Sequence, residues 1–373
     1  MSTITIETIS PVHIGSGNFL SNNSDFVVYN DEDGFRELCV IDPRKILHFV
    51  GTENIDYWVS IIERGGDTRD FMKQKGKGAI PPQYAQRRIA YFSDEIKRND
   101  TLKECLHDGF GRPYIPGSSI KGGIRTAILA TLAKEMPQAE ELVLRNGRTS
   151  ASSVEKKIFG EDPYSDIFRF LHIGDAYFEK GCEIATRMIN LNIRKQNNLI
   201  DKEKSQIVEA IEIGNNATTK LKIDYKHYQL SAGNWPNRAN PLGKLNDCLS
   251  DIKSLFTTIN NHTLKLVSRE IEYWKNVEND GFLGAEDYIE QMNDVLGLIK
   301  NCKKGKECIL RIGHASGWRF ITGAWSEQFD SFNNRIVSAA RRNNIHYEEY
   351  DFPKTRRIDE ESTIFGFIKL SIK

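Results

Sequence analysis

The sequence predicts an α+β fold, and three features of its pattern support this class. Alternating apolar residues indicate a β-strand at each end of the chain, a long helix is expected in the first third, and helical spacing returns over 243–301. This order is typical of a βαββαβ, ferredoxin-like core. The chain has 373 residues, so we expect large insertions into that core and room for two such domains.

The terminal strands and one hairpin are predicted from patterns of period two. The segment "TITIETIS" at 3–10 alternates and ends at Pro11. In "GFIKLSIK" at 366–373, isoleucine and leucine fall on one face and lysine and serine on the other, as in a half-exposed strand. The segments "FVVYN" at 26–30 and "RELCVID" at 36–42 flank "DEDG", which is a hairpin signal.

The early helix is predicted from apolar residues that recur every four positions, beginning in "YIPGSSIKGGIRTAIL" at 114–129. Ser118 or Ser119 is the expected N-cap, and a proline ends the run at position 137. Two adjacent glycines, Gly122 and Gly123, interrupt the pattern. Each is expected to destabilise the helix by about 1 kcal/mol relative to alanine, so some other contact must favour them.

The remaining segments suggest the domain organisation. Residues 61–80 are rich in glycine and charge, which predicts a mobile surface loop. Further strands are expected over 166–178, 182–194, 207–215, 221–230 and the first part of 307–320, which runs into a glycine loop. We expect an N-terminal domain over 1–175, with an insertion at about 20–110, and a C-terminal domain over 176–373 that carries a β-excursion and a helical insertion.

Composition excludes several classes of protein. Lysine plus arginine and aspartate plus glutamate both number 51, so a nucleic-acid partner would need a local basic patch. No run of 18 apolar residues and no signal peptide is present, so we expect a cytoplasmic protein without a membrane partner. The six cysteines lack zinc spacing, so we expect free thiols and neither metal nor cofactor.

The first candidate site is the start of the early helix. First-turn N–H groups have no partner within a helix and carry the positive end of its dipole. Glycine removes the Cβ atom that would hold a ligand away from this backbone. The candidate residues, which together describe an anion site best suited to a phosphate, are Ser118, Ser119, Lys121, Gly122 and Arg125. Equally, the glycines could serve only close helix packing, and the sequence leaves both interpretations open.

Four further segments of the chain carry weaker signals. "HIGSGN" at 13–18 is a glycine loop after a strand, and "RIGHASGWRF" at 311–320 combines glycines, cations and an aromatic, which suits a nucleotide strand. "FPKTRRI" at 352–358 and "NNRIVSAARRNN" at 333–344 are basic runs without an acid, which favour a polyanion contact. The candidate residues are His13, Gly15, Ser16, Gly17, Arg311, His314, Trp318, Arg319, Arg335, Arg341, Arg342, Lys354, Arg356 and Arg357.

Three of these motifs together resemble a known family. "TISPVHIGSG" at 8–17, "YIPGSSIKGGIRTAIL" at 114–129 and "FPKTRRI…GFIKL" at the C-terminal end are similar to the RAMP superfamily of CRISPR proteins. With "RIGHASGW" before the closing motif, the chain looks most like the fifth-subunit family of type III-A Csm effector complexes. The helix-start motif is common to the superfamily, whereas the closing motif points to this subunit. Residues 190–300 contribute little to the resemblance.

The resemblance implies a modified RRM-like, ferredoxin-like fold at the head of a filament, in contact with the 3′ portion of the guide RNA (crRNA). It also implies a role in guide maturation and, as partners, the neighbouring backbone RAMP subunit, the small helical subunit and host trimming nucleases. The family's glycine-loop role falls on Gly366 and "FPKTRR". Because the loop before Gly366 is acidic and no RRM-type aromatic pair is evident, we expect backbone contacts rather than base recognition.

Three functions follow as hypotheses. The first is a non-catalytic guide-RNA-binding subunit of a type III-A interference complex, since no catalytic motif is present. The second is a metal-independent RAMP-type endoribonuclease with His13 as general base and Lys121 assisting, although a lone histidine beside a turn is more often structural. The third is an assembly protein that does not touch RNA.

Overall fold

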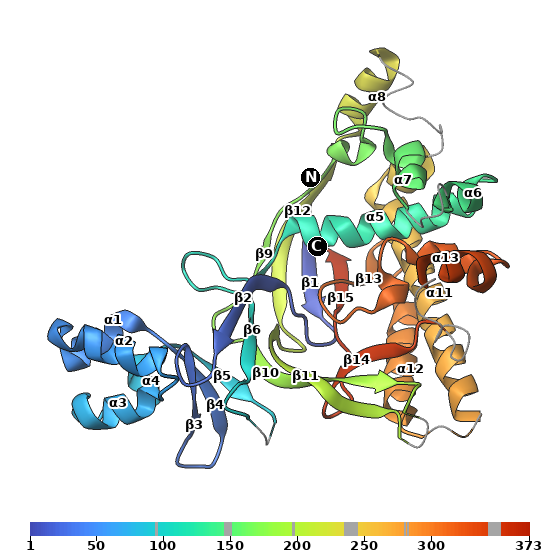
Figure 1. The fold of residues 1–373 in the computed structure, drawn as a ribbon. Coiled ribbons are helices and arrows are strands. Elements are labelled where there is room, and N and C mark those ends of the chain that lie inside the picture. Colours follow the sequence, from blue (N-terminus) through green and yellow to red (C-terminus); the bar gives the residue numbers. More distant parts are fainter. Residues whose placement is uncertain are drawn as a thin grey trace.

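Two β-sheets and the helices packed on them form the chain (Figure 1). This computed structural model describes residues 1–93, 96–144, 151–195, 198–234, 245–279, 281, 283–341 and 352–373. Strands and helices are mixed along the whole described chain, which confirms the predicted α+β class.

The first sheet joins the two ends of the chain. Its strands are β1 (Ser2–Thr8), β7 (Tyr114–Ile115), β8 (Leu171–Ile173), β9 (Ala176–Tyr177), β12 (Asn216–Ile223), β13 (Glu307–Arg311) and β15 (Phe367–Ile372). They lie in the order β13-β15-β1-β12-β9-β7, with β8 also paired to β12. β1 is antiparallel to β15, so Ile6 faces Leu370, and both are buried. The alternation predicted for the terminal strands is therefore confirmed.

The second sheet carries most of the predicted insertions. Its strands are β2 (Gly15–Ser21), β3 (Phe26–Asn30), β4 (Arg36–Ile41), β5 (Ala85–Tyr91), β6 (Thr101–Cys105), β10 (Glu183–Asn192), β11 (Ile200–Ile211) and β14 (Thr355–Asp359). The order is β2-β6-β11-β10-β5-β4-β3, with β14 also paired to β10. The predicted β3–β4 hairpin is confirmed. The loop expected at 13–18 is shorter than predicted, because β2 already begins at Gly15.

The two sheets do not divide at residue 175, where the sequence suggested a domain boundary. β1 pairs with β12 in the first sheet, and β5 pairs with β10 in the second. Each sheet thus takes strands from both halves of the chain, so the halves are interleaved rather than consecutive. The chain crosses between the two sheets several times (Figure 1).

Helix α5 (Gly117–Ala133) confirms the early helix but begins differently from the prediction. Neither Ser118 nor Ser119 acts as N-cap; instead the N–H of Gly117 donates to a carboxylate oxygen of Asp175 at 2.8 Å. Gly123 lies against β13, where an added Cβ would come within 2.9 Å of Ile312 and 3.0 Å of Leu310. Close packing therefore explains Gly123. Gly122 faces open space, where an added Cβ would meet no atom within 4 Å.

Two long helices cover the other end of the molecule. α11 (Ile252–Asn279) and α12 (Glu286–Asn301) lie side by side, as the helical spacing over 243–301 predicted (Figure 1). Thr263 of α11 donates its hydroxyl hydrogen to the carbonyl of Ile309 in β13 at 2.7 Å. The helices bury Trp274, Tyr288 and Met292 against the sheets, so one continuous core supports both β14 and β15.

A small helical lobe lies beside β3 and β4. It contains α1 (Pro43–Val50), α2 (Ile55–Glu63), α3 (Thr68–Lys75) and α4 (Pro81–Tyr84). The surface loop predicted over 61–80 is wrong, because α3 occupies its centre. Asp67 accepts the N–H of Arg69 at 2.8 Å as a helix cap, and Phe71 and Met72 are buried. The buried residues of this helix are Thr68, Phe71 and Met72. They are few among many charged residues, so the composition of the segment did not reveal the helix.

The remaining helices are short. They are α6 (Ala139–Val143), α7 (Ser152–Phe159), α8 (Tyr225–Asn234), α10 (Leu245–Leu249) and α13 (Ser338–Arg341), with 3-10 turns at 52–54, 167–170, 318–320 and 324–328 and a π-helical turn at 332–337. Among the described helices, none has both the length and the apolar composition needed to cross a membrane.

A buried charge cluster fastens α11 to the segments around the two sheets. Glu270, which is fully buried in α11, accepts hydrogen bonds from Arg356 at 2.6 and 2.8 Å, from Arg319 at 2.8 Å and from the hydroxyl of Tyr288 at 2.8 Å. Burial by itself would raise the pKa of Glu270, but Arg356 and Arg319 outweigh it and lower the pKa to about 2. The carboxylate therefore stays ionised at neutral pH.

We predict that Glu270→Gln lowers the free energy of unfolding by about 3–5 kcal/mol, the usual effect of breaking a buried ion pair. The change leaves Arg356 without its counter-charge and Arg319 with Glu327 alone. Glu272→Gln, on the exposed side of the same helix, is the matched control and should change stability by no more than about 0.5 kcal/mol. Urea denaturation measures both variants, and equally small losses would refute a structural role for Glu270.

Candidate nucleic-acid interface

Basic side chains gather in a groove between the β10–β11 hairpin and the closing segment of the chain. The groove has a volume of about 850 Å³, and Trp318 and Phe352 form part of its wall. Its cationic residues are Arg194, Lys195, Lys204, Lys354 and Arg357. We call this set, with the space it lines, the basic groove.

The charges of the basic groove are only partly neutralised. Lys195 forms an ion pair with Glu203 at 2.6 Å. Within the described ranges of the chain, no carboxylate lies at ion-pair distance from Arg194, Lys204 or Arg357. Asp201 and Glu203 line the same groove, so its five cations face two carboxylates. The excess of positive charge on this concave surface produces a field that attracts an anion.

Strand β14 divides the two arginines of the closing motif between core and groove. Arg357 lines the basic groove and donates to the carbonyl of Lys204 at 2.9 Å. Arg356, its neighbour, points to the opposite side of the strand and is only 4% exposed. The prediction that Arg356 contacts RNA is therefore wrong: its guanidinium is bound to Glu270 inside the protein.

Two further donors lie next to Arg357. The ammonium of Lys103, on β6, donates to Nδ1 of His314 at 3.3 Å, so the imidazole is neutral and its proton is on Nε2. Burial, followed by the positive charges of Lys103 and Arg357, lowers the pKa of His314 to about 4. Burial and then Arg357 also lower the pKa of Lys103. The positive charges of Lys103 and Arg357 repel each other, and a bound anion would reduce that repulsion.

His13 lies beneath this surface rather than on it. The residue is fully buried, and Nδ1 of its ring lies 2.5 Å from the carbonyl oxygen of Glu209. Its ring packs edge-on against His314, with 5.7 Å between centroids. Burial lowers the pKa of His13 to about 4. The predicted contact between His13 and RNA is wrong, because no side-chain atom is accessible.

The rest of the N-terminal loop stays at the surface. Gly15 and Gly17 are exposed, and Gly17 has a φ of 94°, which favours glycine. An added Cβ on Gly15 would lie 3.7 Å from Cε of Lys103, so this backbone borders the cations described above. Ser16 donates its hydroxyl hydrogen to Glu104 at 3.0 Å, which fixes the loop and engages the hydroxyl.

Arg311 is structural, contrary to the prediction that it binds RNA. It is 4% exposed, and its Nε donates to the carbonyl of Phe365 at 2.8 Å. Its guanidinium lies over the rings of Phe320 and Phe367, at 4.6 and 4.7 Å from their centroids. Burial lowers the pKa of Arg311. The side chain therefore orients the glycine loop that follows β13 instead of reaching the groove.

The start of α5 retains some of its predicted anion-binding features. Ser118 and Gly122 are exposed, and burial lowers the pKa of Lys121, for which no ion pair with a described residue is recorded. Arg125, however, pairs with Asp166 at 2.9 Å and lies over the ring of Phe159 at 3.9 Å. Asp166 and Glu155 thus offset the charge of Arg125, and its predicted contact with RNA stays a prediction.

Two other predicted basic residues also form ion pairs within the protein. Arg319 is buried on Glu270 and Glu327, and Arg335 pairs with Glu140 and Glu141. The side chains of Arg341 and Arg342 lie outside the residues that the structure describes. The predicted contacts that stay accessible, and so remain predictions, are Gly15, Ser16, Gly17, Ser118, Ser119, Lys121, Gly122, Arg125, His314, Lys354 and Arg357.

Sequence reasoning missed the cations that the second sheet contributes. Lys103 comes from β6, Lys204 from β11 and Arg194 from the turn that follows β10. One signal was present: Lys202 and Lys204 alternate with acids in a strand-like segment, so they share a face. Only the strand pairing brings that face next to the closing motif.

The fold and the groove together define a class of protein: an α+β scaffold of two interleaved sheets that presents a basic groove. The chain belongs to the RAMP superfamily, whose family model matches residues 5–320. This match covers most of the chain and confirms the resemblance that the motifs indicated.

Curated relatives match about half of the chain. The CRISPR system Cms protein Csm5 of Methanocaldococcus jannaschii is 28% identical over 186 residues, which cover 46% of this chain and 42% of the relative. The protein of the same name from Streptococcus thermophilus is 22% identical over 183 residues, which cover 46% and 50%. The matched region therefore spans half or less of the length of these relatives.

Solved structures match over nearly the whole chain. The crystal structure of T. onnurineus Csm5 has a TM-score of 0.67 at 17% identity and covers 98% of this chain and 99% of its own. A chain of the cryo-EM structure of a Csm–crRNA–target RNA ternary complex from a type III-A CRISPR-Cas system has a TM-score of 0.65 at 20% identity, with full coverage of both chains. At these identities the likeness shows a shared fold.

We predict that Lys103→Met raises the pKa of His314 from about 4 toward its ordinary value of 6.5. The rise should be partial, because burial is the larger cause and persists in the variant. NMR titration of the imidazole measures it, with Lys226→Met, an exposed lysine outside the groove, as the control. An unchanged pKa in Lys103→Met would show that the ammonium does not act on His314.

Proposed function

We propose that this chain is the subunit of a type III-A CRISPR Csm complex that binds the 3′ portion of the guide RNA, and that it does not cleave it. The observation that carries the proposal is the basic groove, in which five cations outnumber the two carboxylates of Asp201 and Glu203. The membership in the RAMP superfamily and the relatives named Csm5 support the same assignment.

The chemistry of the groove suits the sugar–phosphate backbone of RNA. Arginine and lysine supply charge-assisted hydrogen bonds to phosphate oxygens and carry no preference for base identity. Trp318 is held by Phe332 and Phe352, with ring centroids 5.4 and 4.8 Å away, and offers a half-exposed aromatic surface at the wall. A subunit that accepts guides of many sequences needs such backbone contacts.

The strand order supports a ferredoxin-like core as the scaffold of this subunit. In the first sheet β15, β1, β12 and β9 are neighbours in that order. Helix α5 connects β1 to the β8–β9 region, and α11 connects β12 to the C-terminal strands. This sequence of elements corresponds to βαββαβ, with the second sheet built from insertions.

The burial of His13 favours a binding role over cleavage. A general base must reach the proton that it removes, and His13 is sealed between the carbonyl of Glu209 and the ring of His314. His314 is accessible, but its Nδ1 accepts from Lys103 and its pKa is low. We therefore assign guide maturation, if this chain takes part in it, to partner nucleases, and assembly contacts to the neighbouring RAMP and small helical subunits.

We predict that Lys204→Ala combined with Arg357→Ala weakens binding of a single-stranded guide 3′ fragment by about tenfold or more, because each charge-assisted contact contributes on the order of 1 kcal/mol. The slope of log affinity against log salt should fall by about 1.4, which corresponds to two phosphates on a single strand. Fluorescence anisotropy at several salt concentrations measures both quantities. Arg44→Ala with Lys226→Ala, exposed cations outside the groove, should change neither.

The variant Arg356→Ala tests whether the two arginines of the closing motif have different roles. It should lower stability as Glu270→Gln does, because both remove one partner of the same buried pair.

An unchanged salt slope in the Lys204 and Arg357 variant would assign the groove to a protein partner. Specific cleavage of precursor guide RNA in EDTA would instead favour the endoribonuclease, and absence of any ultraviolet crosslink within the assembled complex would favour a pure assembly role.

We also predict that RNA affinity rises as pH falls from 7 toward 5. The pKa of His314 is about 4 in the free chain, and a phosphate beside the ring would raise it in the complex. Between those two pKa values the complex binds a proton that the free chain does not, so lower pH favours the complex. His314→Gln should remove this dependence, and a pH-independent affinity in the unmodified chain would place the phosphates away from His314.

A further inference from the structure

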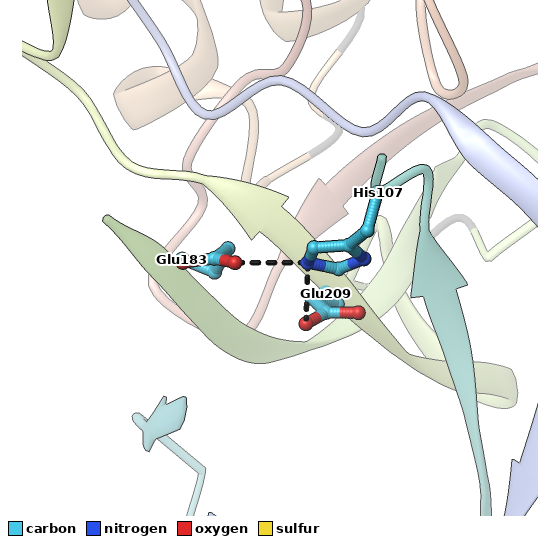
Figure 2. A group of neighbouring side chains, drawn as sticks. All are labelled: His107, Glu183 and Glu209. Atoms are coloured by element: carbon cyan, nitrogen blue, oxygen red, sulfur yellow. Dashed lines mark hydrogen bonds and ion pairs between the residues drawn. The ribbon is translucent and has the colours of Figure 1, made fainter. Parts of the chain in front are cut away.

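Beneath the N-terminal loop, three side chains from separate segments of the chain converge on one point (Figure 2). Nε2 of His107, two residues after β6, lies 2.9 Å from a carboxylate oxygen of Glu183 on β10 and 3.8 Å from one of Glu209 on β11. The three candidate ligand atoms all lie within 4.8 Å of one another. Glu183 is 6% exposed and Glu209 is fully buried.

The hydrogen bonds of His107 require a cation between the ring and the carboxylates. Its Nδ1 lies 2.9 Å from the carbonyl oxygen of Cys105, which can only accept, so Nδ1 carries a proton. In a neutral imidazole Nε2 would then present a lone pair to Glu183 and Glu209, which present only lone pairs in return. Either a second proton or a metal ion must occupy the position between them.

The net charge of the side chains around His107 distinguishes a proton from a metal ion as the occupant of this position. Arg87 bonds both Glu209 and Glu104, so three carboxylates, Glu104, Glu183 and Glu209, share one guanidinium. With a neutral His107 these described groups carry a net charge of about −2, a proton leaves about −1, and a divalent ion leaves none. Unbalanced charge is costly away from water, so the divalent ion satisfies the network most fully.

The surroundings of the three groups also match those of metal ligands. A histidine that binds a metal commonly donates its other ring N–H to a backbone carbonyl, as His107 does to Cys105. Glu209 is held by the N–H of Cys105 at 2.8 Å and by Arg87 at 2.9 Å, which leaves a free lone pair facing His107. The ligand positions are therefore fixed before any ion arrives.

We propose that His107, Glu183 and Glu209 bind one divalent transition-metal ion through an imidazole nitrogen and two carboxylate oxygens. This donor set suits Zn²⁺ or Mn²⁺ rather than Ca²⁺. The ion has a structural role. It joins β6, β10 and β11 under the loop that holds Ser16 through Glu104, and so stiffens one border of the cationic surface.

Metal content and thermal melting of the full chain, prepared without a histidine tag, test this proposal. After dialysis against Zn²⁺ or Mn²⁺, elemental analysis should find one equivalent of metal, and the melting temperature should rise by several degrees, because a ligand that binds only the folded state stabilises it. His107→Gln keeps a donor toward Glu183 but should lose the metal and the rise. His172→Gln, on an exposed histidine, should keep both.

Less than about a tenth of an equivalent, with no change in melting at about 1 mM metal, would overturn the proposal and leave a proton as the occupant. If His107→Gln fails to fold, the metal content and the melting temperature of the unmodified chain still test the proposal. Co²⁺ bound in the site should give d–d absorption stronger than that of the hydrated ion, and the nitrogen chemical shift of Nε2 separates a metal-bound ring from an imidazolium. None of these results depends on whether the chain binds RNA.

Discussion

The carboxylate of Glu270 is the constraint on which the candidate interface depends. It lies at the centre of α11 and accepts hydrogen bonds from Arg319, Arg356 and Tyr288. The two arginines belong to the two segments that line one side of the basic groove, namely the glycine loop after β13 and the closing motif on β14. A single buried anion thus holds both segments on the same helix: it is the described carboxylate that pairs with Arg356, and it shares Arg319 with Glu327.

Buried and exposed arginines have different roles in this chain. Arg356 and Arg311 lie inside, where they bind a carboxylate or carbonyls and stack on aromatic rings. Arg357, one residue from Arg356, lines the groove instead, because successive side chains of a strand point to opposite faces, and no described carboxylate lies at ion-pair distance from it. The interior arginines position the surface, and the exterior ones carry its charge.

Glycines allow the loops of the interface to meet through their backbones. An added Cβ on Gly313 would lie 2.6 Å from the carbonyl of His13, and one on Gly366 would lie 2.3 Å from that of Ile312. Both glycines have positive φ, at 77° and 91°. The N-terminal loop, the loop after β13 and the last loop therefore pack at distances that no other residue permits, which brings His314 beside Lys103.

The sequence by itself determined the α+β class, the terminal strands, the early helix and the family, because each depends on local periodicity or on a motif within a short segment. It also identified one border of the groove, formed by the glycine loop after β13 and the closing motif, but not the β10–β11 border. Only the tertiary structure decided which cations are available. Arg125, Arg311 and Arg356 look like Arg357 in the sequence, but their partners Asp166, Phe365 and Glu270 are distant along the chain. Whether a charge faces water or a counter-charge depends on strand pairing and helix packing, and local sequence carries no record of either.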